Sequence, residues 1–389
     1  STFYQIKETP NGFYEIVFGD GISTGKAPVA GNKIVIDYLS TVGTTANGAT
    51  TFTTDSIVTV NGVQFNITVI TESNSAGGSL KESIESIRQN APLAFSSQRR
   101  LVTAEDYKAL IQTKFGAFIN DVTSFGGNDN VPRIYGKVFV GLQFKDNISD
   151  DTQQNVKDRI KTELTDNLSI MSIDTEFVDP VTTNMVLTTT FNLDPDLTGS
   201  TPQAIQSLVQ NTINNFFTTN LKKFNKVFRR SNLLTLIDAL DPAILNSKME
   251  VQLRQGFIPT LNVSLAYSIS LPVTIAEPSS TDYIVRSTNF TFNNQTCFIR
   301  NLLSSNKLQI ISVDGSVEVD NVGSFDSTSG IISLVGFKPT GFEGNKINLN
   351  VTPANQNTVR PLRNFILDID TSLSTSRAVL DFQNTQVTL

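Results

Sequence analysis

The segment from Phe13 to Gly43 constrains the fold of this chain more than any other stretch. Two apolar runs, Phe13–Phe18 and Ile34–Tyr38, flank a loop that contains four glycines and a proline. Glycine adopts positive φ at little cost, whereas proline fixes φ and cannot donate a backbone hydrogen bond. The segment is therefore expected to form a strand, a loop of defined shape and a second strand.

A glycine-rich loop between strands also raises the question of phosphate binding. A P-loop requires four residues between its first glycine and the Gly-Lys pair, and then Ser or Thr. Here Gly21 and Gly25 enclose three residues, whereas Gly19 and Gly25 enclose five, and alanine follows the lysine. No helical pattern follows that could supply a helix N-terminus for an anion. The spacing argues against nucleotide binding.

Two ordered motifs give the chain a resemblance to a known family. The first is FGDG at positions 18–21, which is followed by Gly25, Pro28 and Gly31. An apolar run that ends in a tyrosine, Ile34–Tyr38, comes next. The second is NAP followed by RRLVTAEDY, at a fitting distance downstream. Together they resemble the baseplate J-like family, structural proteins of contractile phage tails and related injection machines. The motif positions, for which we expect structural roles, are Gly19, Asp20, Gly21, Gly25, Pro28, Gly31, Pro92, Arg99, Arg100, Thr103, Asp106 and Tyr107.

The resemblance implies a structural subunit of the baseplate wedge of a contractile phage tail. The Asn/Thr-rich composition and an additional C-terminal β region make the chain most similar to the C-terminal part of the large wedge-forming members. Such a subunit would contact a second copy of itself and other wedge subunits, in a ring that rearranges when the tail contracts. The expected location is the tail baseplate of the virion, after assembly in the host cytoplasm.

Composition limits the chemistry that the chain can perform. Its 389 residues are 39% hydrophobic and 17% charged, which suits roughly two to four globular domains. Histidine is absent, which removes Ser/His/Asp and Cys/His triads, His-ligated zinc and imidazole acid–base catalysis. The sequence therefore predicts a protein that is not an enzyme and uses no cofactor, no metal and no small-molecule substrate.

Charge, cysteine content and hydropathy bound the partners and the compartment. The single cysteine, Cys297, excludes an internal disulfide and suits a reducing compartment. The net charge of −6 argues against a surface that binds nucleic acid. No apolar run reaches the roughly 18 residues that a membrane helix needs, so no membrane span is expected. No signal peptide is visible at the start of the sequence.

The predicted fold class is α+β and multidomain, with β-rich N-terminal and C-terminal regions flanking a central domain of sheet and helices. Residues 1–116 are expected to form a β-rich region with the family motifs and two helices. Residues 117–275 are expected to form the central α+β domain, and residues 276–389 a C-terminal β domain with a polar tail. Segments 74–78 and 271–280 are candidate joints between these parts.

Hydrophobic periodicity and capping residues predict the elements of the N-terminal region. Asn61-Gly62 predicts a type I′ hairpin whose second strand, 63–69, has one buried face. Ser79 and Glu82 predict a capping box for a helix that stops before Pro92. Thr103 is expected to cap a second helix.

The remaining elements follow from the same patterns. A helix is expected to open at Ser149 or Asp150, and two more near Thr201 and Ser231. Expected strands in the central region lie at 134–144, 173–178 paired with 185–193, 249–253 and 263–269. Expected strands in the C-terminal region lie at 283–292, 308–313, 316–319, 330–335, 346–351 and 362–369.

A cluster of cations stands out in this acidic chain. It occupies the segment KKFNKVFRR and consists of Lys222, Lys223, Lys226, Arg229 and Arg230. Three interpretations are open: a solvated helix C-terminus, an interface complementary to an acidic neighbouring subunit, and a site where the interleaved phenylalanines stack on single-stranded nucleic acid. The cluster is our candidate interface.

Neighbouring carboxylates come closest to a catalytic or metal-binding group. A glycosidase requires two carboxyl groups across one cleft, and an EF-hand requires a spacing that is not found here. Two functions other than a wedge subunit are considered, a receptor-binding or adhesive protein at the tail periphery and a cell-wall-degrading tail enzyme. The carboxylate pairs are Asp150 and Asp151, Asp194 and Asp196, and Asp368 and Asp370.

Overall fold

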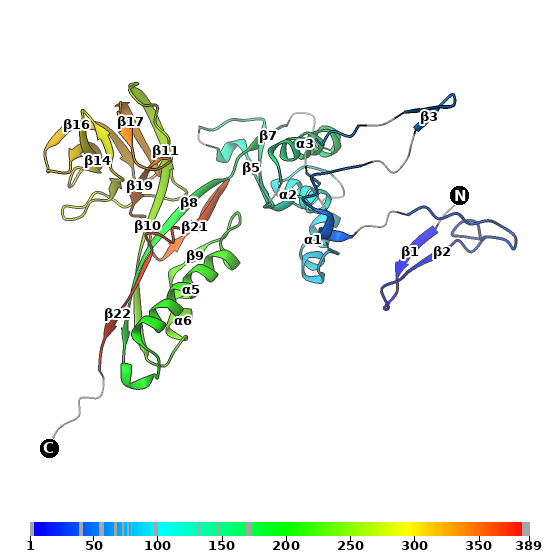
Figure 1. Cartoon of the computed structure of the whole chain (residues 1–389), viewed down its shortest axis with the longest axis horizontal. Helices are drawn as coiled ribbons and strands as arrows, with labels where there is room; N and C mark the ends of the chain where they lie inside the picture. Colours follow the sequence, from blue (N-terminus) through cyan, green and yellow to red (C-terminus); the bar gives the residue numbers. More distant parts are fainter. Residues whose placement is uncertain are drawn as a thin grey trace, which may run out of the picture. The chain divides into compact units, whose positions relative to one another are not determined.

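The computed structural model of the chain is α+β, as predicted, and most of its elements are strands (Figure 1). The chain divides into two compact units, residues 1–45 and residues 46–389. The structure describes residues 4–38, 42–53, 58–65, 68–71, 74–75, 78, 80–96, 100–130, 132–146, 148–168 and 173–382.

The first unit contains an antiparallel hairpin of β1 (Tyr4–Glu8) and β2 (Tyr14–Phe18). This pairing confirms the strand predicted at Phe13–Phe18. The second predicted strand, Ile34–Tyr38, is wrong, because the backbone there is irregular and its side chains are exposed. A strand needs a neighbour for its backbone N–H and C=O groups, and no described residue pairs with this run. A 3₁₀ turn, η1 (Gly43–Ala46), follows.

The next hairpin, β3 (Val58–Val60) and β4 (Val63–Phe65), has the predicted turn but not the predicted buried face. Asn61 and Gly62 have φ of 51° and 80°, the left-handed values of a type I′ turn. Val63 and Phe65 are 57% and 52% exposed. Alternation therefore predicted the start of the strand correctly, but β4 ends at Phe65 and residues 68 and 69 are not in a strand. Burial also requires a packing partner, which the described residues do not provide. Ile67 lies outside the described residues.

Helix α1 (Ile84–Ser96) begins later and ends later than the sequence predicts. Ser79, the predicted cap, lies outside the described residues, and the helix continues through Pro92. Proline cannot donate to the carbonyl of Arg88, four residues earlier. Because Arg88 and Pro92 are both exposed, water can supply the missing partner.

In the second unit, a small sheet of three strands precedes the larger sheet along the chain. β5 and β6 are antiparallel, and β6 and β7 are parallel, joined by a helical crossover. The predicted pairing of 173–178 with 185–193 is therefore wrong, because β7 pairs with β6 instead. Sequence patterns also missed β5, whose apolar alternation is broken by polar residues. The elements are α2 (Ala104–Phe115), β5 (Ile119–Gly126), η2 (Gly127–Asp129), β6 (Lys137–Phe144), α3 (Asp150–Ile160), η3 (Lys161–Thr165), α4 (Asp166–Leu168) and β7 (Asp174–Val178).

The crossover helix contains one π-helical turn, η3, which explains the spacing of its apolar residues. Val156, Ile160, Leu164 and Leu168 recur every four residues, which would drift around an ideal helix of 3.6 residues per turn. The wider π turn compensates for this drift. All four side chains accordingly belong to one core cluster with α2, β5 and β6.

The larger sheet contains thirteen strands, and its longest strands, β8 and β10, are neighbours near the end of the sheet formed by β21. Figure 1 shows α5 and α6 beside this pair, where α6 packs on β10 and α5 packs on β21 and β22. The strands are β8 (Val181–Leu193), β10 (Ile244–Phe257), β11 (Leu265–Ser270), β12 (Val285–Ser287), β13 (Phe290–Phe292), β14 (Gln295–Asn301), β15 (Lys307–Ser312), β16 (Val317–Asp326), β17 (Ile331–Phe337), β18 (Gly341–Phe342), β19 (Ile347–Val351), β21 (Phe365–Ile369) and β22 (Thr375–Leu380).

Three short elements and two helices complete this body. Thr201 is the N-cap of α5, which confirms the helix start predicted there, and the helix predicted at Ser231 begins at Arg230. No helix in the described ranges is long and apolar enough to cross a membrane. The elements are η4 (Pro195–Leu197), α5 (Pro202–Asn220), β9 (Phe228–Arg229), α6 (Arg230–Asp238) and β20 (Thr358–Val359), of which β9 and β20 pair with each other.

The predicted polar tail is wrong for residues 375–380, which form β22. β21 and β22 both run parallel to β8, one after the other along the same strand. Ser374 lies just before β22, and its hydroxyl accepts a hydrogen bond of 3.1 Å from the Leu187 amide. Polar residues can therefore complete the sheet edge, which hydrophobic alternation alone does not reveal.

Candidate functional site

The first family motif forms a closed loop organised by one carboxylate, that of Asp20. Its Oδ1 accepts backbone hydrogen bonds of 2.9 to 3.0 Å from Ile22, Ser23 and Thr24. Hydrogen bonds from the Thr24 and Ile22 amides and the Ser23 hydroxyl hold the pKa of Asp20 far below its usual value. A Cβ on Gly19 would lie 2.6 Å from the Gly25 carbonyl carbon. The loop satisfies its own polar groups, which supports a structural role.

Other motif positions in this loop also shape the backbone. Gly21, Gly25 and Gly31 have φ of 79°, 116° and 93°, and the Gly21 amide donates to the Gly25 carbonyl at 2.8 Å. Pro28 precedes a turn in which the Val29 amide donates to the Asn32 side chain at 2.7 Å.

Asp20→Ala should open this loop without unfolding the second unit. We expect amide hydrogen exchange at Ile22, Ser23 and Thr24 to accelerate by roughly tenfold, because their shared acceptor is lost. Because the folded-state pKa is lowered, the carboxylate stabilises the loop fully above the usual value of 3.8 and loses this effect as pH falls toward the folded-state pKa. Amide hydrogen exchange of both proteins, measured by mass spectrometry as the pH is lowered, tests the faster exchange and its pH dependence.

Asp37→Ala is the matched control, since it removes an exposed carboxylate from the same unit. Equal exchange rates in the Asp20→Ala variant and the unmodified protein would contradict the structural role of Asp20.

The second motif caps and anchors helix α2. Thr103 is its N-cap. Asp106 completes a capping box, because its carboxylate accepts a hydrogen bond of 2.8 Å from the Thr103 amide. Tyr107 is fully buried, and burial raises the pKa of its phenol. Pro92 lies inside α1, Arg100 is exposed, and Arg99 is outside the described residues. The motif positions that the structure describes in α2 thus build a helix start.

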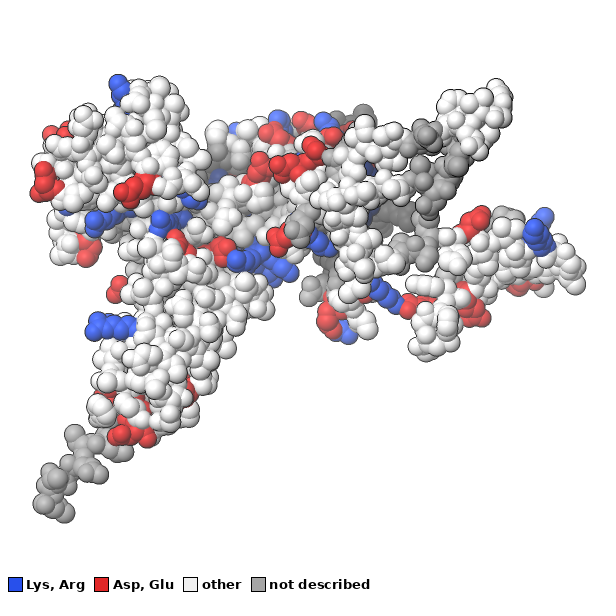
Figure 2. All heavy atoms as spheres, viewed as in Figure 1, with Lys and Arg blue, Asp and Glu red and all other residues white. Residues whose placement is uncertain are grey.

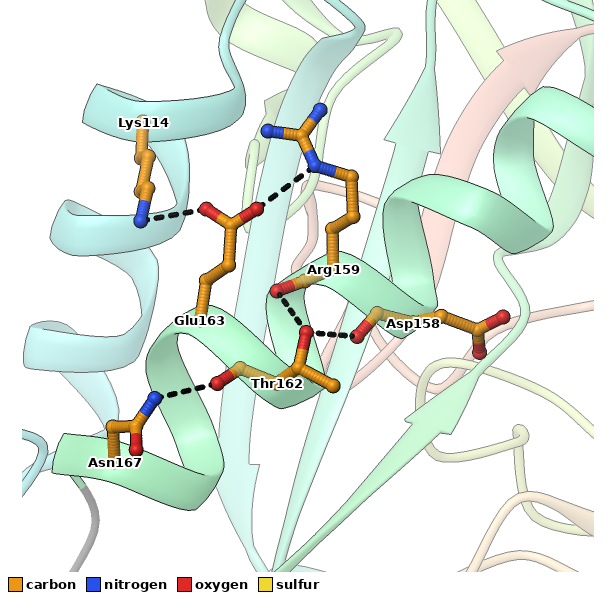
Figure 3. Close-up of polar contacts among 6 residues, drawn as sticks. All are labelled: Lys114, Asp158, Arg159, Thr162, Glu163 and Asn167. Carbon is orange, nitrogen blue, oxygen red and sulfur yellow. Dashed lines mark hydrogen bonds and ion pairs between the residues drawn. The ribbon is translucent and has the colours of Figure 1, made fainter.

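Figure 3 shows how α2 is clamped to the π turn of the crossover helix. The Glu163 carboxylate forms ion pairs with Lys114 Nζ at 2.7 Å and with Arg159 Nε at 2.9 Å. Hydrogen bonds from Lys114 and Arg159 lower the pKa of Glu163. The Arg159 guanidinium also lies 5.3 Å from the Phe115 ring centroid. These contacts hold two helices together and present no open site.

The structure divides the predicted basic cluster into cations that have a partner within the chain and cations that are exposed. Lys222 Nζ pairs with Asp368 Oδ2 at 2.9 Å, and the Arg230 guanidinium donates to the Met249 carbonyl at 3.0 Å. Lys223, Lys226 and Arg229 are exposed and make no ion pair with a described residue. Only these three remain available to a partner.

The same segment joins the small sheet to the large one. The Phe224 amide donates to Asp121 Oδ2 at 2.8 Å, and Gln143 Nε2 donates to the Lys222 carbonyl at 3.2 Å. Phe224 and Phe228 are 2% and 0% exposed. Buried rings cannot stack on bases, so the nucleic-acid interpretation loses its aromatic support.

The carboxylate pairs have structural partners. Asp150 and Asp151 occupy the first turn of α3, where the helix dipole favours them. Buried Asp194 accepts the Asp196 amide at 3.1 Å. Asp368 binds Lys222, and Asp370 Oδ2 lies 3.3 Å from Arg254. Within the described ranges, no three metal-ligating side chains come together.

One cavity of about 730 Å³ lies where the η2 loop meets the residues before β21. Its lining mixes one phenylalanine, amides, one carboxylate and two arginines, with no pair of groups arranged for catalysis. The lining residues are Phe125, Asn128, Asp129, Asn130, Pro132, Arg133, Leu362 and Arg363.

Comparison with known proteins relates both sheets to one phage protein. The family model for the baseplate structural protein gp6, C-terminal domain I, matches residues 103–178, and the model for its C-terminal domain III matches residues 189–256. The baseplate wedge protein gp6 of Enterobacteria phage T4 is 27% identical over 324 residues. The chain resembles a baseplate wedge protein. The aligned region covers 75% of this chain and 45% of the T4 protein.

The first match covers the small sheet and its helices, whereas the second covers only part of the large sheet. The domain I match runs from the cap of α2 to the end of β7, and the domain III match runs from within β8 to within β10. These findings support a baseplate wedge relative, while the baseplate J-like assignment stays a prediction. The predicted boundary between residues 116 and 117 lies inside the core shared by α2 and β5. The division into three domains also stays a prediction.

Proposed function

We propose that this chain is a structural subunit of the baseplate wedge of a contractile phage tail. The single observation that carries the proposal is the similarity to the T4 wedge protein, which extends over 324 residues and includes both sheets. The subunit would be located in the tail baseplate of the virion after assembly in the host cytoplasm. It would act through protein contacts and not as an enzyme, without cofactor, nucleic acid or small-molecule substrate.

The burial pattern of the N-terminal part supports a protein that works inside an assembly. Among the residues before Leu101 whose side chains the structure describes, no hydrophobic side chain is buried, although many are large. Phe13, Tyr38 and Phe95, for example, are 71%, 82% and 86% exposed. Large exposed apolar surfaces are typical of regions that pack against other proteins. The proposed partners are a second copy of the chain and other wedge subunits, arranged in a ring.

Rearrangement of the ring on contraction belongs to the same proposal, with segments 74–78 and 271–280 as candidate joints. In the described conformation both are held by backbone hydrogen bonds. The Gly48 amide donates to Ser75, and the Leu271 amide donates to Gly330, at 2.7 and 2.8 Å. Rotation at either joint therefore requires that such bonds break.

Antibody labelling of intact tails, viewed by electron microscopy, tests the proposed function. We expect antibodies against this chain to label the baseplate body and to change position after contraction. Label at fibre tips would instead favour a receptor-binding protein. Clearing of cell-wall suspensions by the purified chain would favour a cell-wall-degrading enzyme. Particles without label would contradict both the baseplate location and the fibre-tip location.

Charge reversal of the exposed cations should abolish incorporation into the wedge complex. The variant is Lys223→Glu/Lys226→Glu/Arg229→Glu, which spares Lys222 and Arg230 because both have internal partners. Like charges facing an acidic neighbour repel it, so we expect loss of co-purification with the neighbouring wedge subunits. Circular dichroism and the thermal unfolding midpoint should remain unchanged.

The control is Lys248→Glu/Lys338→Glu/Arg377→Glu, which changes the charge equally at exposed positions elsewhere. If the first variant co-purifies as well as this control, the segment is plain solvated surface.

A further inference from the structure

A row of polar side chains crosses seven strands of the large sheet on the face away from its core. Directly opposed residues of neighbouring strands lie on the same face of a sheet. The strand register therefore places on one face, in order, Asp368, Asn184, Arg254, Asn350, Arg286, Arg300 and Gln309. The adjacent positions Leu253, Val285 and Ile299 are 0% to 1% exposed and belong to the core on the other face.

The first half of this row is neutralised by the chain's own carboxylates. Asp368 pairs with Lys222, and Arg254 pairs with Asp370 at 3.3 Å, with both of these side chains 14% exposed. The C-terminal end of β21 thus supplies the counter-charges here. In Figure 2, Lys and Arg atoms lie over the part of the sheet that Figure 1 labels β10 and β19.

The second half of the row, from Asn350 to Gln309, contains two arginines without such counter-charges. Arg286 and Arg300 are direct cross-strand neighbours, and neither forms an ion pair with a described residue. Like charges in this position repel each other. Arg300 Nε and Asn350 Oδ1 are also buried without a hydrogen-bond partner. Because these two atoms are buried, a partner would bind the outer N–H groups of half-buried Arg300 and those of exposed Arg286.

Aromatic rings hold both guanidinium groups in place. The Arg286 guanidinium lies 4.6 Å from the Phe298 ring centroid, and the Arg300 guanidinium lies 4.5 Å from the Tyr283 ring centroid. Stacking restricts an arginine while leaving its N–H groups free to bind a carboxylate in the plane of the group. We call Arg286, Arg300, Phe298 and Tyr283 the arginine shelf.

We propose that the arginine shelf docks an acidic polypeptide segment of a partner protein. Aspartate or glutamate carboxylates of that segment would bind Arg286 and Arg300, as Asp370 binds Arg254 on the other half of the row. Arginine forms two parallel hydrogen bonds with a carboxylate, which suits this geometry. The proposal concerns partner chemistry and stands independently of the baseplate assignment.

Fluorescence anisotropy with a labelled ten-residue peptide of alternating Glu and Thr tests the proposal. We expect the purified chain to bind this peptide, and Arg286→Gln/Arg300→Gln to weaken binding by about tenfold or more. The control, Lys248→Gln/Arg377→Gln, removes two exposed cations from the same sheet and should bind as the unmodified chain does. The thermal unfolding midpoint of the shelf variant should not fall, since the substitution removes a repulsion.

Three results would overturn the proposal. One is peptide binding by the unmodified chain that is no tighter than binding by the Arg286→Gln/Arg300→Gln variant. Another is tighter binding of a ten-nucleotide oligothymidylate that depends on the same two arginines, which would make the shelf a phosphate site. The third is a lowered unfolding midpoint with unchanged peptide binding, which would make both arginines structural. Full binding by Arg286→Lys/Arg300→Lys would overturn the role of the planar, stacked guanidinium.

Discussion

Phe228→Ala is expected to lower the free energy of unfolding of the large-sheet core by about 3–5 kcal/mol. Phe228 is fully buried in β9, where its ring stacks on Phe217 at 5.9 Å and meets Phe216 edge-on at 6.4 Å. The same strand pairs with β20 and leads directly into α6. Truncation would remove the ring that joins these elements and leave a cavity that the surrounding strands cannot close.

Urea unfolding followed by circular dichroism measures this effect as a lower midpoint. Phe95→Ala is the matched control, because Phe95 is 86% exposed on α1. It should change stability by less than about 0.5 kcal/mol. Equal midpoints for the two variants would contradict the placement of Phe228 in the core.

Gly323→Ala is expected to destabilise the C-terminal strands by about 3 kcal/mol or more. Gly323 has φ of 154°, and a Cβ there would lie 2.0 Å from the Ser333 carbonyl oxygen. Its cross-strand neighbours, Leu308 and Leu334, are both fully buried. The methyl group would therefore push β16 away from β17 and disturb the core on both sides.

Gly315→Ala separates steric contact from backbone strain. Gly315 also has positive φ, 95°, but a Cβ there would meet no atom within 4 Å. We expect a cost of about 1–2 kcal/mol from the left-handed backbone alone. Thermal unfolding of both variants gives the comparison. A Gly323→Ala variant as stable as Gly315→Ala would show that β16 and β17 separate without cost.

Much of the local structure was predictable from short sequence patterns. Thr103 caps α2, Ser149 caps α3, and Thr201 caps α5 as expected. On α5, the buried side chains Ile205, Val209, Ile213 and Phe217 recur at helical spacing, as an amphipathic helix requires. The family motif around Asp20 was also predicted to be structural, and its hydrogen bonds support that role.

The candidate interaction surfaces were less predictable. The basic segment was visible in the sequence because its residues are consecutive, but its division into paired and exposed cations depends on Asp368 and Met249. The arginine shelf gave no sequence signal, because Arg286 and Arg300 are isolated arginines in unremarkable strands. Their relation became visible only through strand register.

The sequence by itself determined where α2, α3 and α5 begin and where the Asn61-Gly62 turn forms, because caps and turns depend on neighbours a few positions away. It also determined which residue types are absent. The tertiary structure alone decided that β7 pairs with β6, that Ile34–Tyr38 has no described strand partner and that β22 lies along β8. Strand pairing depends on backbone groups and packing surfaces that are distant in the chain, and local periodicity carries no information about which distant strand will supply them.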